Sequence, residues 1–165
     1  MKYFEPGDIL LSDFDGVYLD SQRHFSEFMK EEKSLELWTK YLNSINWREF
    51  LRECKEMPKA TETFLELQEL GILRGFITRI HSFDEGIEKC NFIRGKGFII
   101  PIYYVLPEQS KSDVYRPNKK IILLDDKEEN ALDWEKNDGK SLVFNPYSIS
   151  EGKRLVKKLD DLLTK

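Results

Sequence analysis

The chain has 165 residues, a formal net charge of −4 and a hydrophobic content of 40%. These values are typical of one globular domain with room for a small insertion, and they exclude two full domains. No apolar run approaches the roughly 18 residues that a membrane-spanning helix needs. Residues 1–6 show no secretory signal, so we expect a cytoplasmic protein without a membrane partner. The oligomeric state is not indicated.

The two cysteines, Cys54 and Cys90, and the two histidines, His24 and His81, stand in no metal-ligand spacing. We therefore expect reduced thiols and no zinc site, so that a bound metal would be a hard cation held by oxygen atoms. The negative net charge gives no general attraction to nucleic acid. Between residues 79 and 96, basic residues alternate with acidic ones, which predicts a mixed solvated surface; the acidic ones are Asp84, Glu85 and Glu88.

The first apolar run, residues 9–11, leads into two acids separated by one residue, Asp13-Phe14-Asp15-Gly16. Side chains alternate along an extended chain, so both carboxylates would point the same way. Two acids in one small space repel each other, which predicts a bound divalent cation or one ionised and one protonated carboxyl group. Asp15-Gly16 is equally typical of a two-residue hairpin turn. Both interpretations stay open at this point.

Residues 21–57 are rich in charged and aromatic side chains and contain no strand pattern. We expect two or three helices here, forming a small cap over the carboxyl edge of a sheet. A second layer of core would explain the aromatic residues equally well. The predicted division is a core of residues 1–20 and 58–165 and a cap of residues 21–57.

Four further apolar runs alternate with helical patterns, which predicts the buried strands of a parallel α/β sheet. They are residues 72–77, 99–105, 121–124 and 142–144. Pro101 indicates an edge strand or a later start for the run at 99–105. Residues 59–70 are predicted to form a helix that ends at Gly71. Residues 148–163 are predicted to form a helix packed on the sheet, with a capping box from Ser148 to Glu151 and its leucines on one side.

Residues with chemical potential follow several of these strands. They are Asp13 and Asp15 after the first, Thr78 and Arg79 after the second, Lys111 in the loop before the fourth, and Asp125 and Asp126 after the fourth. Ligands of open α/β sheets bind at the carboxyl ends of the strands. Acids that hold Mg²⁺, together with hydroxyl and ammonium groups for phosphoryl oxygens, are typical of phosphoryl transfer.

In this order the motifs resemble those of the haloacid dehalogenase superfamily of phosphohydrolases. The resemblance implies a Rossmann-like three-layer α/β sandwich with a mostly parallel sheet and a small helical cap after the first strand. It implies a Mg²⁺-dependent phosphatase in which Asp13 is the nucleophile and Asp15 the acid and base. The implied phosphate-binding residues are Thr78, Arg79 and Lys111. The implied Mg²⁺ ligands are Asp13, the backbone carbonyl of Asp15, and Asp125 or Asp126.

Three details of the resemblance concern single positions. Lys111 is preferred over Lys119 and Lys120, which we interpret as solvated residues before the fourth strand. Asn130 stands where many relatives carry a further acid, which leaves the outer part of the metal site undefined. Within the superfamily, the pattern of residues 111–144 and the place of the cap resemble 5′(3′)-deoxyribonucleotidase-like proteins. A nucleotide or another small phosphorylated metabolite is therefore the expected substrate. The candidates for contact with its leaving group are His24, Phe25, Trp38, Trp47 and Arg79, for each of which a packing or surface role is an equal alternative.

Other functions stay open on the sequence. A response-regulator receiver uses similar residues, but there the lysine comes last, whereas here the Asp125-Asp126 pair follows Lys111. A polynucleotide 3′-phosphatase would need an open, basic approach to the site. A phosphotransferase shares the same two acids, but nothing in the sequence marks a second phosphate site. A catalytically inert binding module of the same fold would need further assumptions, because all the catalytic residue types are present.

Overall fold

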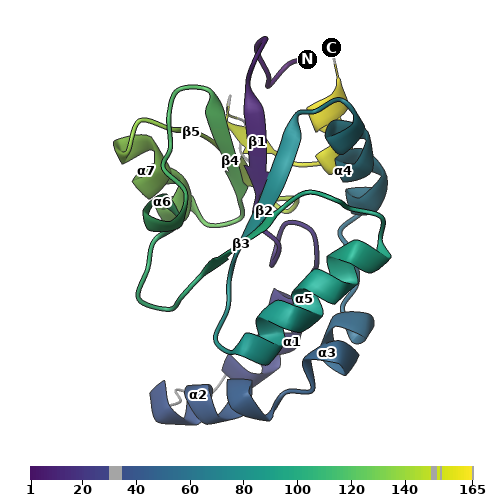
Figure 1. Cartoon of the computed structure of the whole chain (residues 1–165), viewed down its shortest axis with the longest axis vertical. Helices are drawn as coiled ribbons and strands as arrows, with labels where there is room; N and C mark the ends of the chain where they lie inside the picture. Colours follow the sequence, from purple (N-terminus) through teal and green to yellow (C-terminus); the bar gives the residue numbers. More distant parts are fainter. Residues whose placement is uncertain (30–34, 150–151, 153, 165) are drawn as a thin grey trace.

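The structure is a computed structural model that describes residues 1–29, 35–149, 152 and 154–164. In these residues the centre is a six-stranded, all-parallel sheet in the order β3-β2-β1-β4-β5-β6 (Figure 1). The strands are β1 Ile9–Ser12, β2 Leu73–Arg79, β3 Ile102–Val105, β4 Ile121–Asp125, β5 Lys140–Phe144 and β6 Leu155–Val156. The predicted parallel α/β sheet is confirmed, and β3 begins after Pro101, as the proline indicated.

Helices cover both faces of the sheet, which gives the predicted three layers (Figure 1). On one face, α4 (Ala60–Glu69), α5 (Phe83–Gly95) and the 3-10 turn η1 (Leu159–Leu163) enclose the larger core, around Phe14, Phe64 and Phe76. On the other face, α6 (Lys111–Val114) and α7 (Glu128–Lys136) enclose a smaller core that contains Trp134. Strands buried on both faces need apolar side chains in both directions, which explains the continuous apolar runs.

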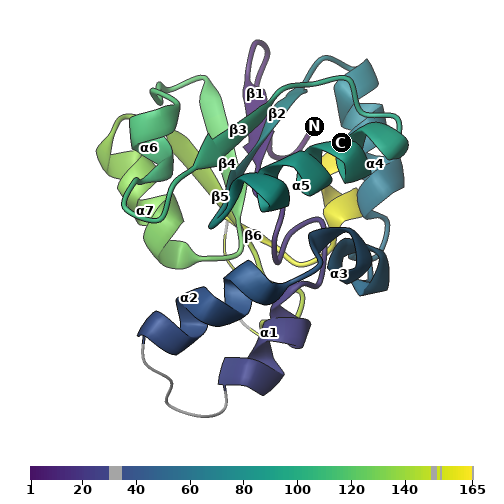
Figure 2. The same cartoon turned by 60° about the horizontal axis from the view of Figure 1, so that its bottom comes forward.

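Three helices stand between β1 and α4 in the described part of the chain, in agreement with the two or three expected for residues 21–57. They are α1 (Gln22–Met29), α2 (Leu35–Ser44) and α3 (Trp47–Glu53). Figure 2 shows α1 and α2 beyond the carboxyl ends of the strands, with α3 beside α5. This arrangement places the insertion at the edge of the sheet where the sequence predicts a site. None of the described helices is long and apolar enough to span a lipid bilayer.

The hairpin interpretation of Asp15-Gly16 is wrong, because β1 pairs in parallel with β2 and β4. Instead the chain closes a compact turn in which the Leu19 N–H donates to the Phe14 carbonyl. Gly16 adopts a φ of +78° in this turn, which favours glycine. A Cβ atom there would also lie 2.5 Å from Asp126 Oδ2. The glycine therefore serves the packing of a loop next to Asp126.

The predicted C-terminal helix over residues 148–163 is also wrong. Leu155 and Val156 form β6, which pairs in parallel with β5, and only Leu159–Leu163 are helical, as a 3-10 turn. Leu159 and Leu162 are buried, as predicted, because an i, i+3 spacing also suits a 3-10 turn. The Glu151 end of the proposed capping box lies outside the described residues. The helix at 59–70 is confirmed as α4, and Gly71 follows it with a φ of +70°.

Gly139 lies against the largest fully buried side chain, and this contact gives a test of the smaller core. A Cβ atom at Gly139 would lie 2.3 Å from the indole ring of Trp134 and 2.9 Å from Pro117. We therefore expect Gly139→Ala to lower the free energy of unfolding by about 1–3 kcal/mol, measured by urea denaturation. Gly95→Ala is the control, because a Cβ atom there meets no heavy atom within 4 Å; equal losses in both variants would contradict the packing described.

Candidate active site

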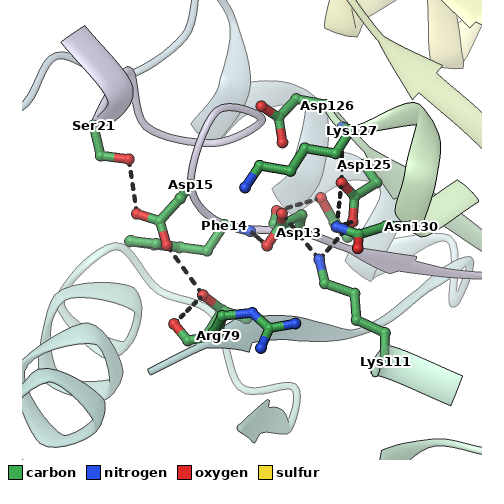
Figure 3. Close-up of polar contacts among 12 residues, drawn as sticks. Asp13, Phe14, Asp15, Ser21, Arg79, Lys111, Asp125, Asp126, Lys127 and Asn130 are labelled. Carbon is green, nitrogen blue, oxygen red and sulfur yellow. Dashed lines mark hydrogen bonds and ion pairs between the residues drawn. The ribbon is translucent and has the colours of Figure 1, made fainter. Parts of the chain in front are cut away.

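The sequence-predicted residues lie together at the carboxyl ends of β1, β2 and β4. Asp13 directly follows β1, Thr78 and Arg79 end β2, and Asp125 ends β4. Lys111 begins α6 and points to the same place from the loop after β3 (Figure 3). A cavity of about 490 Å³ opens between this edge and the insertion. Its lining includes Asp13, Asp15, Arg79, Lys111, Asp126, Lys127 and Asn130 from the core and Gln22, Phe25, Trp38 and Leu42 from the insertion.

One buried ammonium group links two buried carboxylates. Lys111 Nζ lies 2.9 Å from Asp13 Oδ2 and 2.6 Å from Asp125 Oδ2. The start of α6 is fixed by a capping box, in which Ser110 and Asp113 exchange hydrogen bonds between side chain and backbone. This cap holds Lys111 at the first helical position, so its side chain reaches across to β1 and β4.

Asp13 is a buried acid that still borders the cavity. Burial raises the pKa of Asp13 to about 7; Lys111 opposes this rise, and the neighbouring charge of Asp125 adds to it. Its Oδ1 atom accepts a hydrogen bond of 2.7 Å from the Phe14 N–H, which fixes the side chain at the end of β1. Asp13 therefore presents one carboxylate oxygen to Lys111. Burial disfavours the ionised form of this acid, and a bound cation would stabilise that form.

Asp125 is fully buried, and its carboxylate is surrounded by donors. It accepts hydrogen bonds from the backbone N–H of Lys127 at 2.9 Å and from Asn130 Nδ2 at 3.0 and 3.1 Å, besides the contact with Lys111. The amide at position 130, where many relatives carry an acid, thus donates to Asp125 and adds no further negative charge. This replacement limits the number of acids that face the cavity.

Asp126 completes a group of three acids. One oxygen each of Asp13, Asp125 and Asp126 lie within 4.8 Å of one another. Asp126 Oδ1 is buried and has no hydrogen-bond partner among the described residues. Burial raises the pKa of Asp126 to about 6, with the charge of Asp125 adding to the rise. Oδ2 accepts a hydrogen bond from Gln22 of α1. An unpartnered carboxylate oxygen beside two further acids fits a hard divalent cation such as Mg²⁺.

Asp15 lies apart from these three acids, although it is only two residues from Asp13. Its Oδ1 accepts a hydrogen bond of 2.7 Å from Ser21, and its Oδ2 lies 3.2 Å from the Thr78 hydroxyl and 2.6 Å from Lys89 Nζ. Burial alone would raise the pKa of Asp15, but the charge of Lys89 and the hydrogen bonds from Lys89 and Ser21 lower it. The two acids of the motif thus have opposite shifts of pKa.

Lys89 and Glu85 are site residues that the sequence analysis missed. From the sequence, Glu85 is predicted to lie on a mixed solvated surface, and Lys89 is given no role. In the structure, however, Glu85 is only 2% and Lys89 only 1% exposed. Their i, i+4 spacing on the helix that follows Thr78 was the available signal, because it places an acid and a base on one face of α5. That assignment of Glu85 is therefore wrong, because its carboxylate is buried against Lys89, one turn along α5, and against the backbone N–H of His81.

Arg79 lies in the cavity wall, and its guanidinium group binds the loop between β3 and α6. It donates hydrogen bonds to the carbonyls of Leu106, Pro107 and Gln109, the segment that precedes Lys111. Lys120, by contrast, pairs with Asp8 at the opposite end of β4, so it lies far from the acids. The fold therefore places Lys111, and not Lys120, beside Asp13 and Asp125.

The wall contributed by the insertion is aromatic and apolar. Phe25 and Trp38 line the cavity half-buried, with ring centroids 5.6 Å apart in an edge-to-face contact, and Leu42 lies beside them. Trp47 is buried and packs against Phe50 instead. The aromatic residues of the insertion therefore have both predicted roles: some form part of a core, and others form the wall of the cavity.

No protein-family model and no curated protein matches the chain. Among solved structures, it is similar to a haloacid dehalogenase-like hydrolase from Streptococcus pneumoniae, with 14% identity over 99% of this chain and 98% of that one and a TM-score of 0.61. A putative β-phosphoglucomutase from Thermotoga maritima shares 14% identity over 94% and 98% of the two chains, with a TM-score of 0.56. A predicted phosphatase from Clostridium acetobutylicum shares 15% over 94% and 95%, with a TM-score of 0.58.

At such low identity these likenesses show the fold, which is that of haloacid dehalogenase-like hydrolases. They cover nearly the whole chain, insertion included, so the expectation drawn from the motifs is confirmed at the level of fold. The narrower resemblance to 5′(3′)-deoxyribonucleotidases stays a prediction.

The raised pKa values of Asp13 and Asp126 predict how Mg²⁺ affects stability. An acid whose pKa rises from 3.8 to about 7 on folding makes the folded state less stable as pH increases between these values. A cation that binds the ionised acids offsets this loss. We expect Mg²⁺ to raise the melting temperature more at pH 8 than at pH 5, where protons compete for the same oxygens. Differential scanning fluorimetry with and without MgCl₂ measures this effect.

Asp126→Asn should reduce the effect of Mg²⁺, whereas Asp160→Asn, which changes an exposed acid of η1, should not. An equal rise in melting temperature at both pH values, or an undiminished rise in Asp126→Asn, would contradict a cation site at these acids.

Proposed function

We propose that the protein is a Mg²⁺-dependent phosphatase that hydrolyses a small phosphomonoester through an aspartyl-phosphate intermediate. The observation that carries this proposal is the contrast between two acids on one short loop. Asp13 lies beside Lys111 and the other acids of the candidate cation site, whereas Asp15 is held apart by Ser21 and Lys89. Titratable groups whose environments push their pKa values apart are typical of a divided acid-base role.

In the first step, a carboxylate oxygen of Asp13 would attack phosphorus, and the bond between phosphorus and the ester oxygen would break. The departing oxygen takes a proton from Asp15. Because Lys89 favours the ionised form of Asp15 in the free protein, this proton would enter with the substrate. A phosphomonoester has a second pKa of about 6 and so still carries that proton in part of its population near neutral pH.

In the second step, water would attack the phosphorus atom of the aspartyl-phosphate, and Asp15 would accept its proton. The bond from phosphorus to the Asp13 oxygen breaks, which releases inorganic phosphate and restores the carboxylate. The lowered pKa of Asp15 supports this role, since an acid that is ionised at neutral pH is ready to accept a proton.

The phosphoryl oxygens would be bound by groups beside the two acids. Lys111 lines the cavity beside Asp13, and the Thr78 hydroxyl lies beside Asp15; both side chains are almost fully buried. Arg79 has five N–H groups and uses three contacts for loop carbonyls, so it keeps donors for an anion. Donors fixed in place before the reaction stabilise charge that develops in the transition state.

The cation would be held by Asp13, Asp125 and Asp126, with the backbone carbonyl of Asp15 as a further proposed ligand. When bound, Mg²⁺ supplies positive charge that allows an anionic phosphate to approach these carboxylates. The unpartnered Oδ1 of Asp126 supports this assignment.

A small substrate is favoured by the shape of the cavity. A volume of about 490 Å³ under the insertion suits a nucleotide or another small phosphorylated metabolite rather than a long polymer. The half-buried rings of Phe25 and Trp38 would contact the organic part of the leaving group, because aromatic rings pack well against flat apolar groups.

Replacement of the proposed nucleophile tests this function. We expect Asp13→Asn to lower kcat for p-nitrophenyl phosphate with MgCl₂ by at least about 10³-fold, because an amide oxygen cannot form the intermediate. Circular dichroism should show an unchanged fold, and removal of divalent cations with EDTA should abolish turnover in the unmodified protein. Asp160→Asn is the matched control and should retain full activity.

Two results would contradict the proposal. Substantial residual turnover in Asp13→Asn would remove the nucleophile assignment. Failure of the unmodified protein to hydrolyse any member of a panel of phosphorylated metabolites, nucleotides and 3′-phosphorylated oligonucleotides would favour an inert binding module. Tight, salt-dependent binding of the oligonucleotides, with release of their phosphate, would favour a polynucleotide 3′-phosphatase.

A further inference from the structure

Lys89 is a buried ammonium group that does not border the cavity, and its contacts lead to Asp15. Its Nζ atom lies 2.6 Å from Asp15 Oδ2, 3.1 Å from Thr78 Oγ1 and 2.9 Å from the Arg79 carbonyl. With the side chain only 1% exposed, each of these oxygens replaces water around the charge. A lysine is almost never buried to this extent unless it is paired, so the cluster fixes where the ammonium group lies.

The second acid of the cluster, Glu85, anchors Lys89 from the other side. Glu85 Oε1 lies 2.7 Å from Lys89 Nζ, one helical turn along α5. Glu85 Oε2 accepts a hydrogen bond of 2.7 Å from the His81 N–H and lies 3.3 Å from His81 Nδ1. The carboxylate of Glu85 is therefore tied to the start of α5, and Lys89 is held between a fixed acid and Asp15.

This cluster decides which way Asp15 points. Lys89 and Thr78 hold Oδ2, while Ser21 holds Oδ1, so the carboxylate is turned away from the three acids of the candidate cation site. Without Lys89, the Asp15 carboxylate would keep only the hydroxyl groups of Ser21 and Thr78 as partners among the residues that the structure describes. The side chain of Asp15 is still 27% exposed and lines the cavity, so it can reach a substrate that Lys89 cannot touch.

We propose that Lys89, anchored by Glu85, is a positioning residue that holds the Asp15 carboxylate where it can exchange a proton with the leaving oxygen. This inference rests on the proposed phosphatase function and concerns one residue pair that acts through Asp15. The rate of ester cleavage would then depend on α5, the helix that carries Lys89 and Glu85.

The expected consequence is a change in the leaving groups that the enzyme accepts. An aryl phosphate such as p-nitrophenyl phosphate has a weakly basic leaving oxygen that departs with little help from a proton. An alkyl phosphate such as glycerol 3-phosphate has a strongly basic leaving oxygen, and its cleavage depends on Asp15. A misplaced Asp15 should therefore slow alkyl phosphates far more than aryl phosphates, which a general loss of folded protein cannot do.

The experiment compares kcat and KM for these two substrates in Lys89→Met and in the unmodified protein. We expect kcat/KM, which reports ester cleavage, to fall by about 10²–10⁴-fold for the alkyl phosphate, the usual contribution of a proton-transfer group, and by less than about 10-fold for the aryl phosphate. The kcat for both substrates should fall as well, because Asp15 also accepts the proton of water when the common aspartyl-phosphate is hydrolysed. Asp15→Asn should show the same preference for the aryl substrate. Lys96→Met is the matched control, because Lys96 ends α5 and pairs with Glu56, outside the site.

Lys89→Met leaves two acids without their cation and can prevent folding. The double variant Lys89→Met/Glu85→Gln removes one of these charges as well, and it should fold with the same preference for aryl phosphate. Equal losses of kcat/KM for the two substrates, or no loss, in a folded variant would overturn the role of Lys89 while leaving the phosphatase function in place. If the unmodified protein cleaves neither substrate nor any other phosphate ester, the proposed function falls and this inference with it.

Discussion

The contact between Lys111 and the carboxylates of Asp13 and Asp125 is the constraint on which the rest of the site depends. All three groups are almost completely buried, and two acids at this distance from each other would repel strongly without the cation. Asp126 lies beside the pair, so three acids face Lys111 and the neighbouring Lys127, and the two ammonium groups do not balance them. The excess negative charge is what makes this end of the sheet a site for a divalent cation rather than a closed ion pair.

The sheet supplies the rigidity that such a charge cluster needs. β1 lies between β2 and β4, with Leu11 in register with Gly75 and Leu123. The Asp13 N–H continues the ladder by donating to the Leu124 carbonyl at 2.8 Å. Backbone hydrogen bonds thus fix the position of Asp13 in addition to its side-chain contacts. Residues that follow parallel strands emerge at the same edge, so acids far apart in the sequence meet without a long loop.

How far the sequence could predict this structure depends on whether the signal is local. The buried strands and the acids at their ends could be predicted, because an apolar run followed by Asp13 or Asp125 carries both signals within a few residues. Lys89 could not be placed, since its partner Asp15 lies 74 residues away. β6 was predicted as helix for a related reason: its pairing with β5 is a long-range contact, whereas the spacing of Leu159 and Leu162 suits an α-helix and a 3-10 turn alike.

The motif Asp13-Phe14-Asp15 shows the same division between local and long-range information. Its spacing indicates that two acids share one loop, but it does not say which of them is easily ionised. That property comes from lysines on different helices, Lys111 on α6 and Lys89 on α5. Burial raises the pKa of Asp13, and Lys111 opposes this rise only in part, whereas at Asp15 the charge and hydrogen bond of Lys89 outweigh burial and the pKa falls. Two identical side chains thus acquire different chemistry from the helices that follow β2 and β3, which is why the loop alone does not define the site.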